Sequence, residues 1–158
     1  MLRQWSKQIL SKWIDVYTIL IQRMIASDDQ SAKDRLEKEL LENVVKMSEN
    51  SQPLSVRTSS MYFLARIAHN NSLNSKAAFS TKLLPKVRAL CQDFNWEVRK
   101  EICRHIHFIS SYIENPSSIL LTDLVELTED EEIEVKTCAI KTLVKHMLKI
   151  FPPIFCKS

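Results

Sequence analysis

The sequence predicts an all-α fold, a right-handed α–α superhelix of about three to four stacked helical hairpins. The first reason is an internal repeat, because Leu83–Cys103 returns in degenerate form 37 residues later as Leu120–Ile140. The second is that the 158 residues contain no glycine, which disfavours the tight turns of β-hairpins. The third is that apolar residues advance in steps of three and four, as on one face of a helix.

The N-terminal half predicts three helices. The first spans residues 2–26 and is apolar around so much of its circumference that it needs a covering partner. The polar stretch Ser27–Ser31 then supplies N-cap candidates for a helix over residues 32–48. Pro53 cannot continue a helix, so a third helix is predicted over residues 56–69.

Four more helices are predicted after the polar linker Asn70–Lys76. They span about residues 80–92, 96–113, 117–128 and 132–151. Asn115 and Pro116 supply a cap and a first-turn proline, while Pro152-Pro153 ends the last helix.

These helices pair into units, because the second helix of each pair opens with a valine and a basic residue. The openings are Val56-Arg57, Val98-Arg99 and Val135-Lys136. We therefore predict one array of helical-hairpin repeats over residues 1–151 and a non-repeat tail over residues 152–158. The approximate units are residues 1–31, 32–76, 77–115 and 116–151. A coiled coil is the competing interpretation, which fails because no heptad pattern is sustained.

Composition excludes several classes of function. Nucleotide-binding loops need glycine, so no cofactor is expected. The net charge of +3, from 22 basic and 19 acidic residues, does not indicate a nucleic-acid partner. The apolar runs are too short to span a membrane, so no membrane partner is expected. The four cysteines contain no CxxC pair, which indicates free thiols, a reducing compartment and a cytoplasmic location.

Two motifs resemble metal sites, but neither supplies a suitable set of ligands, and no metal is expected. On a helix Cys103 and His107 share one face, whereas His105 points to another. The acidic cluster Glu129–Glu132 lacks the glycine of a calcium loop, and we expect it to cap a helix. No local pairing of a nucleophile with a base is evident, so the chain is not expected to be an enzyme.

The stretch Leu83–Cys103 resembles HEAT repeats, specifically those of phosphatase scaffolds. Its turn Asp93–Arg99, DFNWEVR, looks like the turn typical of the scaffold A subunit of protein phosphatase 2A. The longer run Leu83–Phe151 looks more like the regulatory subunit 4 family of protein phosphatase 4, through LCQD followed by EVR. Members of these families are several times longer, so the chain also looks like a fragment, a truncated form or a short relative.

The resemblance implies an inter-repeat ladder. Arg57, Arg99 and Lys136 occupy one slot in successive units, while Asp93 and Asp130 occupy another. In the families that the chain resembles, such residues form charge-assisted hydrogen bonds between adjacent repeats.

The resemblance also implies a partner-binding ridge at the turns. The predicted ridge residues are Phe94, Asn95, Trp96 and Glu97. Trp96 is the first candidate for an anchor, because tryptophans often dominate binding energies at interfaces. The alternative is that Trp96 folds back onto the neighbouring repeat.

We therefore expect a non-catalytic scaffold or regulatory subunit that binds a protein, in particular the catalytic subunit of a type 2A/4-like Ser/Thr phosphatase. An adaptor for tubulin or for trafficking is the alternative with the same fold. A further alternative is a truncated fragment with little independent function.

Overall fold

The computed structural model describes residues 7–26, 28–69, 79–110 and 119–150, and these ranges contain helices and no strand. The all-α prediction is therefore confirmed for this part of the chain. The helices are α1 (Lys7–Ile25), α2 (Gln30–Met47), α3 (Leu54–His69), α5 (Leu84–Cys91), α6 (Trp96–Ser110), α7 (Ile119–Leu127) and α8 (Ile133–Ile150). A π-helical turn, η2 (Phe79–Leu83), leads into α5.

The predicted helices match the observed ones to within a few residues, and local chemistry explains the differences. Asp29 caps α2 by accepting a hydrogen bond from the Ala32 amide at 3.0 Å, so that helix begins two residues before its predicted start. The carbonyl of Pro53 accepts bonds from the amides of Val56 and Arg57, so α3 begins immediately after the proline.

Several predictions lie outside the described residues. They include the first residues of the first helix, the linker over residues 70–76, the cap at Asn115-Pro116 and the tail with Cys156. The division of the chain into one array of units stays a prediction.

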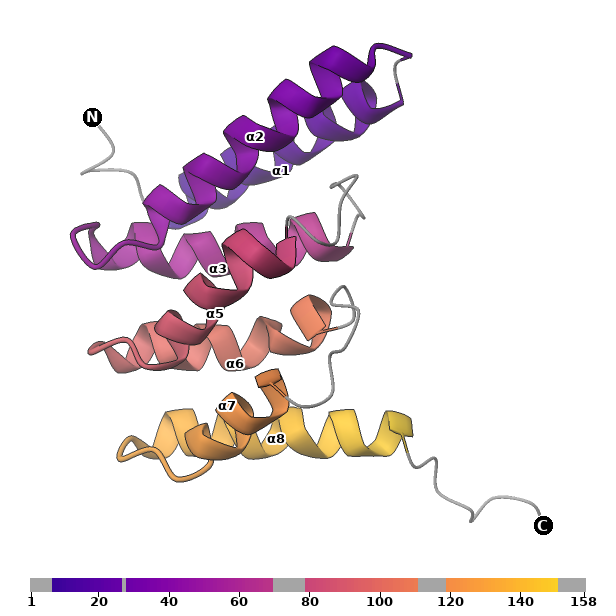
Figure 1. Ribbon diagram of the computed structural model, residues 1–158. Helices are drawn as coiled ribbons and strands as arrows, with labels where there is room; N and C mark the ends of the chain where they lie inside the picture. The colour runs from indigo at the N-terminus through magenta and orange to yellow at the C-terminus, as the bar shows by residue number, and fades with distance from the viewer. Residues whose placement is uncertain (1–6, 27, 70–78, 111–118, 151–158) are drawn as a thin grey trace.

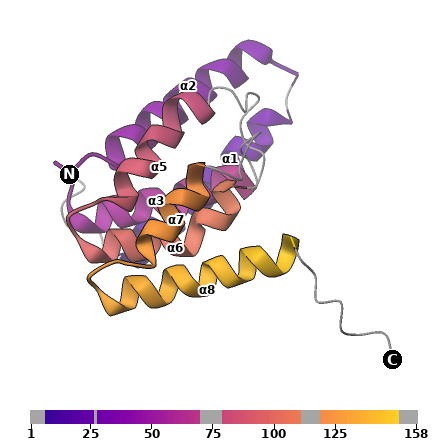
Figure 2. The ribbon, with the colours of Figure 1, turned by 60° about the horizontal axis from the view of Figure 1, so that its bottom comes forward.

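The helices form antiparallel hairpins that lie one above another (Figure 1). The hairpins are α2–α3, α5–α6 and α7–α8, while α1 packs against both α2 and α3. The second helices contact in succession, α3 with α6 and α6 with α8, and the first helices α5 and α7 also contact. In the turned view, α8 lies at one end of the stack and α2 at the other (Figure 2).

One apolar core runs through the whole stack, from Ile14 on α1 to Ala139 on α8. Equivalent positions of the second helices are buried alike. Val56, Val98 and Val135 are each at most 1% exposed. Neighbouring hairpins thus bury one another's apolar stripes, as the repeat pattern predicts.

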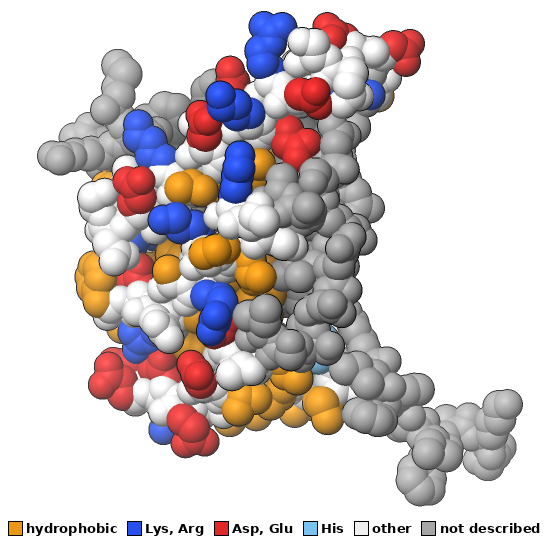
Figure 3. Space-filling model, viewed as in Figure 1, with side chains coloured by type: hydrophobic (Ala, Val, Ile, Leu, Met, Phe, Trp, Pro, Cys, Tyr) orange, Lys and Arg blue, Asp and Glu red, His pale blue; other side chains and the backbone are white. Residues whose placement is uncertain are grey.

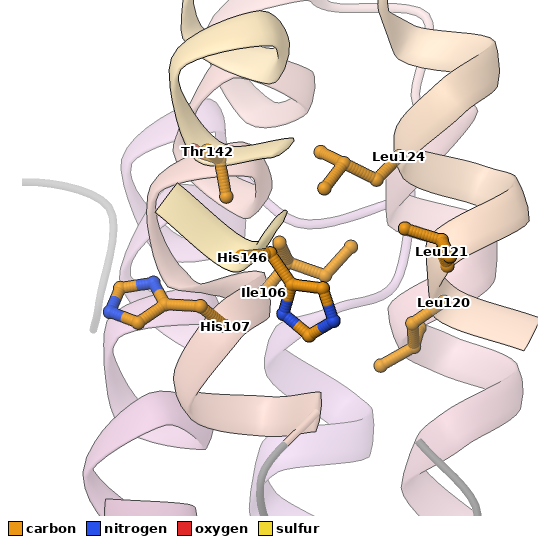
Figure 4. Close-up of a pocket in the computed structure, with 7 residues that line it drawn as sticks. All are labelled: Ile106, His107, Leu120, Leu121, Leu124, Thr142 and His146. Carbon is orange, nitrogen blue, oxygen red and sulfur yellow. The ribbon is translucent and has the colours of Figure 1, made fainter. Parts of the chain in front are cut away.

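His146 occupies the position that Ile109 occupies in the preceding unit, and it lies at the edge of this core. It lines a small pocket with Thr142, Ile106 and residues of α7. Figure 4 shows the His146 ring between His107 and the leucines of α7. A polar ring is accepted here because the slot is only partly buried, whereas the equivalent Ile109 is fully buried.

We predict that Leu90→Ala lowers the free energy of unfolding by about 2–5 kcal/mol, because it leaves a cavity between hairpins. Leu90 is 2% exposed, whereas Val125 on α7 is 47% exposed. Val125→Ala is the matched control and should change stability by less than about 0.5 kcal/mol. Urea unfolding measures both, and equal effects would contradict a core that passes through Leu90.

Candidate functional site

The first rung of the ladder joins α3 to the turn that precedes α6. Nε and Nη2 of Arg57 donate to the two carboxylate oxygens of Asp93 at 2.9 and 3.1 Å. The third donor, Nη1, reaches the Gln52 carbonyl at 2.8 Å. The two side chains are 4% and 0% exposed. A bidentate pair so far from water is strong and directional.

The second rung repeats this arrangement one hairpin later, with the same atoms. Nε and Nη2 of Arg99 donate to the carboxylate of Asp130 at 2.7 and 2.9 Å. Nη1 of Arg99 donates to the Asp93 carbonyl at 2.7 Å, which connects the second rung to the turn of the first. The Arg99 hydrogen bond holds the pKa of the Asp130 carboxyl below its ordinary value, and it raises the pKa of Arg99.

Each aspartate of the ladder also shapes its own turn. Oδ1 of Asp93 accepts from the Asn95 amide at 2.8 Å, and Oδ1 of Asp130 accepts from the Glu132 amide at 2.9 Å. This side chain to backbone contact two residues on is the bond of an Asx turn. The same carboxylate therefore fixes the turn and ties it to the preceding hairpin.

The predicted third basic member, Lys136, behaves differently from the two arginines. It is half-buried, and within the described part of the chain it forms no ion pair. Its positive charge contributes to the lowered pKa of Asp130. The structure thus brings together four of the five predicted ladder residues as two ion pairs.

The turn before α6, the predicted ridge, presents Phe94 rather than Trp96. The Phe94 side chain is 72% exposed, and its ring lies 4.6 Å from the guanidinium carbon of Arg57. Trp96 is the first residue of α6, is half-buried, and packs against the apolar core. Trp96 therefore lies against the core, and its packing on the neighbouring repeat stays a prediction.

The remaining ridge residues belong to the start of α6. Oδ1 of Asn95 accepts from the Glu97 amide at 2.9 Å, while the Glu97 side chain is exposed. The Nζ atom of Lys100 lies 5.3 Å from the Trp96 ring and forms an ion pair with Glu134 of α8. These contacts fix the turn so that Phe94 projects from a rigid base.

Two more ion pairs between helices, besides that of Lys100 with Glu134, were not predicted. Arg88 of α5 contacts Asp123 of α7 at 3.1 Å, and the Asp123 side chain is 2% exposed. Arg66 of α3 contacts Asp15 of α1 at 3.0 Å. These residues do not occupy equivalent slots in the repeat, so alignment of the units contains no signal for them.

The cysteines of α6 and α8 form a pair. Cys103 is buried and Cys138 is half-buried, and the Cys138 sulfur lies 3.7 Å from the carbonyl oxygen of Lys100, one helical turn before Cys103. The neighbouring Cys103 thiol, with the charges of Arg104 and Lys100, lowers the pKa of the Cys138 thiol. Among the described residues, no three His, Cys, Asp or Glu side chains gather as metal ligands would.

The chain is similar to the serine/threonine-protein phosphatase 4 regulatory subunit 4 of Mus musculus, with 31% identity over 133 residues. It is 33% identical over 121 residues to the Homo sapiens protein of the same name. The matches cover 83% and 75% of this chain but 15% and 13% of the relatives. No family model and no solved structure matches. The chain therefore has distant, partial homology to proteins named as regulatory subunits.

Within the described ranges, none of the helices is sufficiently long and apolar to pass through a membrane.

We predict that Asp130→Asn destabilises the chain by about 2 kcal/mol or more, because it leaves Arg99 without its charged partner. The adjacent Glu131 is the matched control, since its side chain is 88% exposed and lies 3.9 Å from Arg99. Glu131→Gln should cost less than about 0.5 kcal/mol. Urea unfolding compares the two, and similar losses would show that the rung does not stabilise the stack.

The same pair predicts a pH dependence. Since the folded pKa of Asp130 is lowered, its stabilisation is present above the unfolded carboxyl pKa of about 3.9. It is lost as the pH falls through the folded pKa. The difference in unfolding free energy between wild type and Asp130→Asn should therefore be full at neutral pH and shrink below about pH 4. A difference that grows on acidification would contradict this sign.

Proposed function

We propose that the chain is a non-catalytic scaffold or regulatory element for a Ser/Thr protein phosphatase of the type 2A/4-like class. In this proposal its hairpins are HEAT units of a right-handed superhelix that occupies residues 1–151. The homology to regulatory subunits supports a regulatory role. The observation that carries the proposal is the exposed Phe94, presented by a turn that a buried ion pair holds in place.

The turns are arranged as a docking edge requires. The α2–α3, α5–α6 and α7–α8 turns all lie along the same side of the stack (Figure 1). Acidic side chains gather where the α7–α8 turn lies (Figure 3). The sequence of this turn contains the exposed Glu129, Glu131 and Glu132. Ile133, which follows them, is 70% exposed. A partner that fits this edge would have apolar pockets that accept Phe94 and Ile133. It would also have basic side chains around these pockets that pair with the acidic residues of the turn.

A rigid edge suits binding, because ordering a loop on association costs free energy. Here the ladder orders the turns before any partner arrives. An adaptor role toward another partner would use the same edge, but the homology favours a phosphatase.

We predict that Phe94→Ala weakens binding to a purified phosphatase 4 catalytic subunit by roughly tenfold or more, because it removes a protruding aromatic anchor. Phe108, 36% exposed near the other end of α6, is the matched control, and Phe108→Ala should leave affinity unchanged. Titration calorimetry measures affinity, and thermal unfolding checks that both variants are folded. Equal affinity for Phe94→Ala and wild type would remove the ridge from the proposal, and no binding by wild type would overturn the proposal itself.

A further inference from the structure

Cys103 and Cys138 come from neighbouring hairpins and are held against each other. Two contacts fix α8 on α6 at this level. The Cys138 sulfur lies 3.7 Å from the Lys100 carbonyl oxygen, and the Thr142 hydroxyl donates to the Cys103 carbonyl at 2.9 Å. These contacts place Cys138 beside the turn of α6 that carries Cys103.

The two thiols differ in their access to solvent. Cys103 is 0% exposed within the core. Cys138 is half-buried and lines an open groove of about 370 Å³ between α6 and α8. Lys100, Arg104 and Lys141 also line this groove, and Glu134 is its acidic residue. A small oxidant entering the groove would therefore meet Cys138 first, in a positively charged setting.

We propose that Cys138 is a peroxide-reactive thiol and that Cys103 resolves its oxidised form into a disulfide between α6 and α8. In the first step the Cys138 sulfur attacks one peroxide oxygen, the O–O bond breaks, and the leaving hydroxide is protonated to water. In the second step the Cys103 sulfur attacks the Cys138 sulfenic acid, the S–O bond breaks, and the Cys103 proton leaves with the hydroxide. Two thiols and one peroxide give one disulfide and two waters.

Electrostatics assign these roles in the same order. The neighbouring Cys103 thiol and the charges of Arg104 and Lys100 lower the pKa of the Cys138 thiol. The neighbouring Cys138 thiol and burial raise the pKa of Cys103. The thiolate is the nucleophilic form of cysteine. At neutral pH, therefore, Cys138 attacks the peroxide, and Cys103 stays protonated until the sulfenic acid forms beside it.

The repeat does not require this pair of cysteines. At the preceding contact between second helices, that of α3 with α6, Met61 is equivalent to Cys103 at an offset of 42 residues. Glu101 is equivalent to Cys138 at an offset of 37 residues. Cys91, the other described cysteine, is buried on α5, where burial raises the pKa of its thiol. The paired thiols are thus specific to the contact between α6 and α8, and the repeat architecture does not require them.

The test uses the full chain with Cys91→Ser and Cys156→Ser, so that only the proposed pair remains. After treatment with hydrogen peroxide at neutral pH, mass spectrometry of a non-reduced digest should show linked Cys103 and Cys138 peptides. The pair should be oxidised at least about fivefold faster than free cysteine, because more Cys138 is thiolate. Thermal unfolding of the reduced and oxidised forms should show a higher midpoint after oxidation.

Single variants separate the two roles. With Cys103→Ser, dimedone should trap a sulfenic acid on Cys138, since no resolving thiol remains. With Cys138→Ser, Cys103 should stay unmodified while the chain is folded, as circular dichroism verifies. Dimedone labelling of Cys103 in place of Cys138, or a folded wild type whose pair is oxidised no faster than free cysteine, would overturn the proposal. Phosphatase binding plays no part in these readouts, so the outcome is independent of the proposed function.

Discussion

The buried pairs of Arg57 with Asp93 and Arg99 with Asp130 are the constraint on which the stack depends. The apolar core favours close packing of the hairpins, but hydrophobic contact is not directional and tolerates small shifts. A bidentate ion pair without access to water does not tolerate such shifts, because a shift that broke it would leave a charge buried and unpaired. The core therefore holds the hairpins together, while the ladder selects one register between them.

The ladder also determines the geometry of the turns. The ladder aspartates act twice, once toward their own turn and once toward the preceding arginine. Turn geometry and stacking geometry are consequently coupled. Phe94 lies over the first rung, at 4.6 Å from the Arg57 guanidinium carbon, whereas its equivalent Glu131 approaches Arg99 at 3.9 Å. An aromatic side chain thus lies next to the first ion pair and an acidic one next to the second, so successive turns of the stack have different outer surfaces.

The sequence predicted the features that recur in each repeat unit, and it missed the contacts that do not recur. Apolar periodicity predicted the helices, the recurring slots predicted that the hairpins stack, and the resemblance implied the ladder of arginines and aspartates. Trp96 and Phe94 are near neighbours in one turn, and only the packing of α6 on the core decides which ring is buried. Pairs such as Arg88 with Asp123 join positions that are not equivalent, so they depend on how first helices pack in three dimensions.

The contacts between successive second helices also differ from one another. Between α3 and α6 the first rung is almost fully buried, with side chains 4% and 0% exposed. Between α6 and α8 the rung is more open, at 11% and 7% exposed, and the paired thiols lie on the same joint. A covalent bond between Cys103 and Cys138 would add a directional constraint where the ionic one is more accessible to solvent. Stiffness of the array would then be adjustable at one joint, and the edge that presents Phe94 and Ile133 spans that joint.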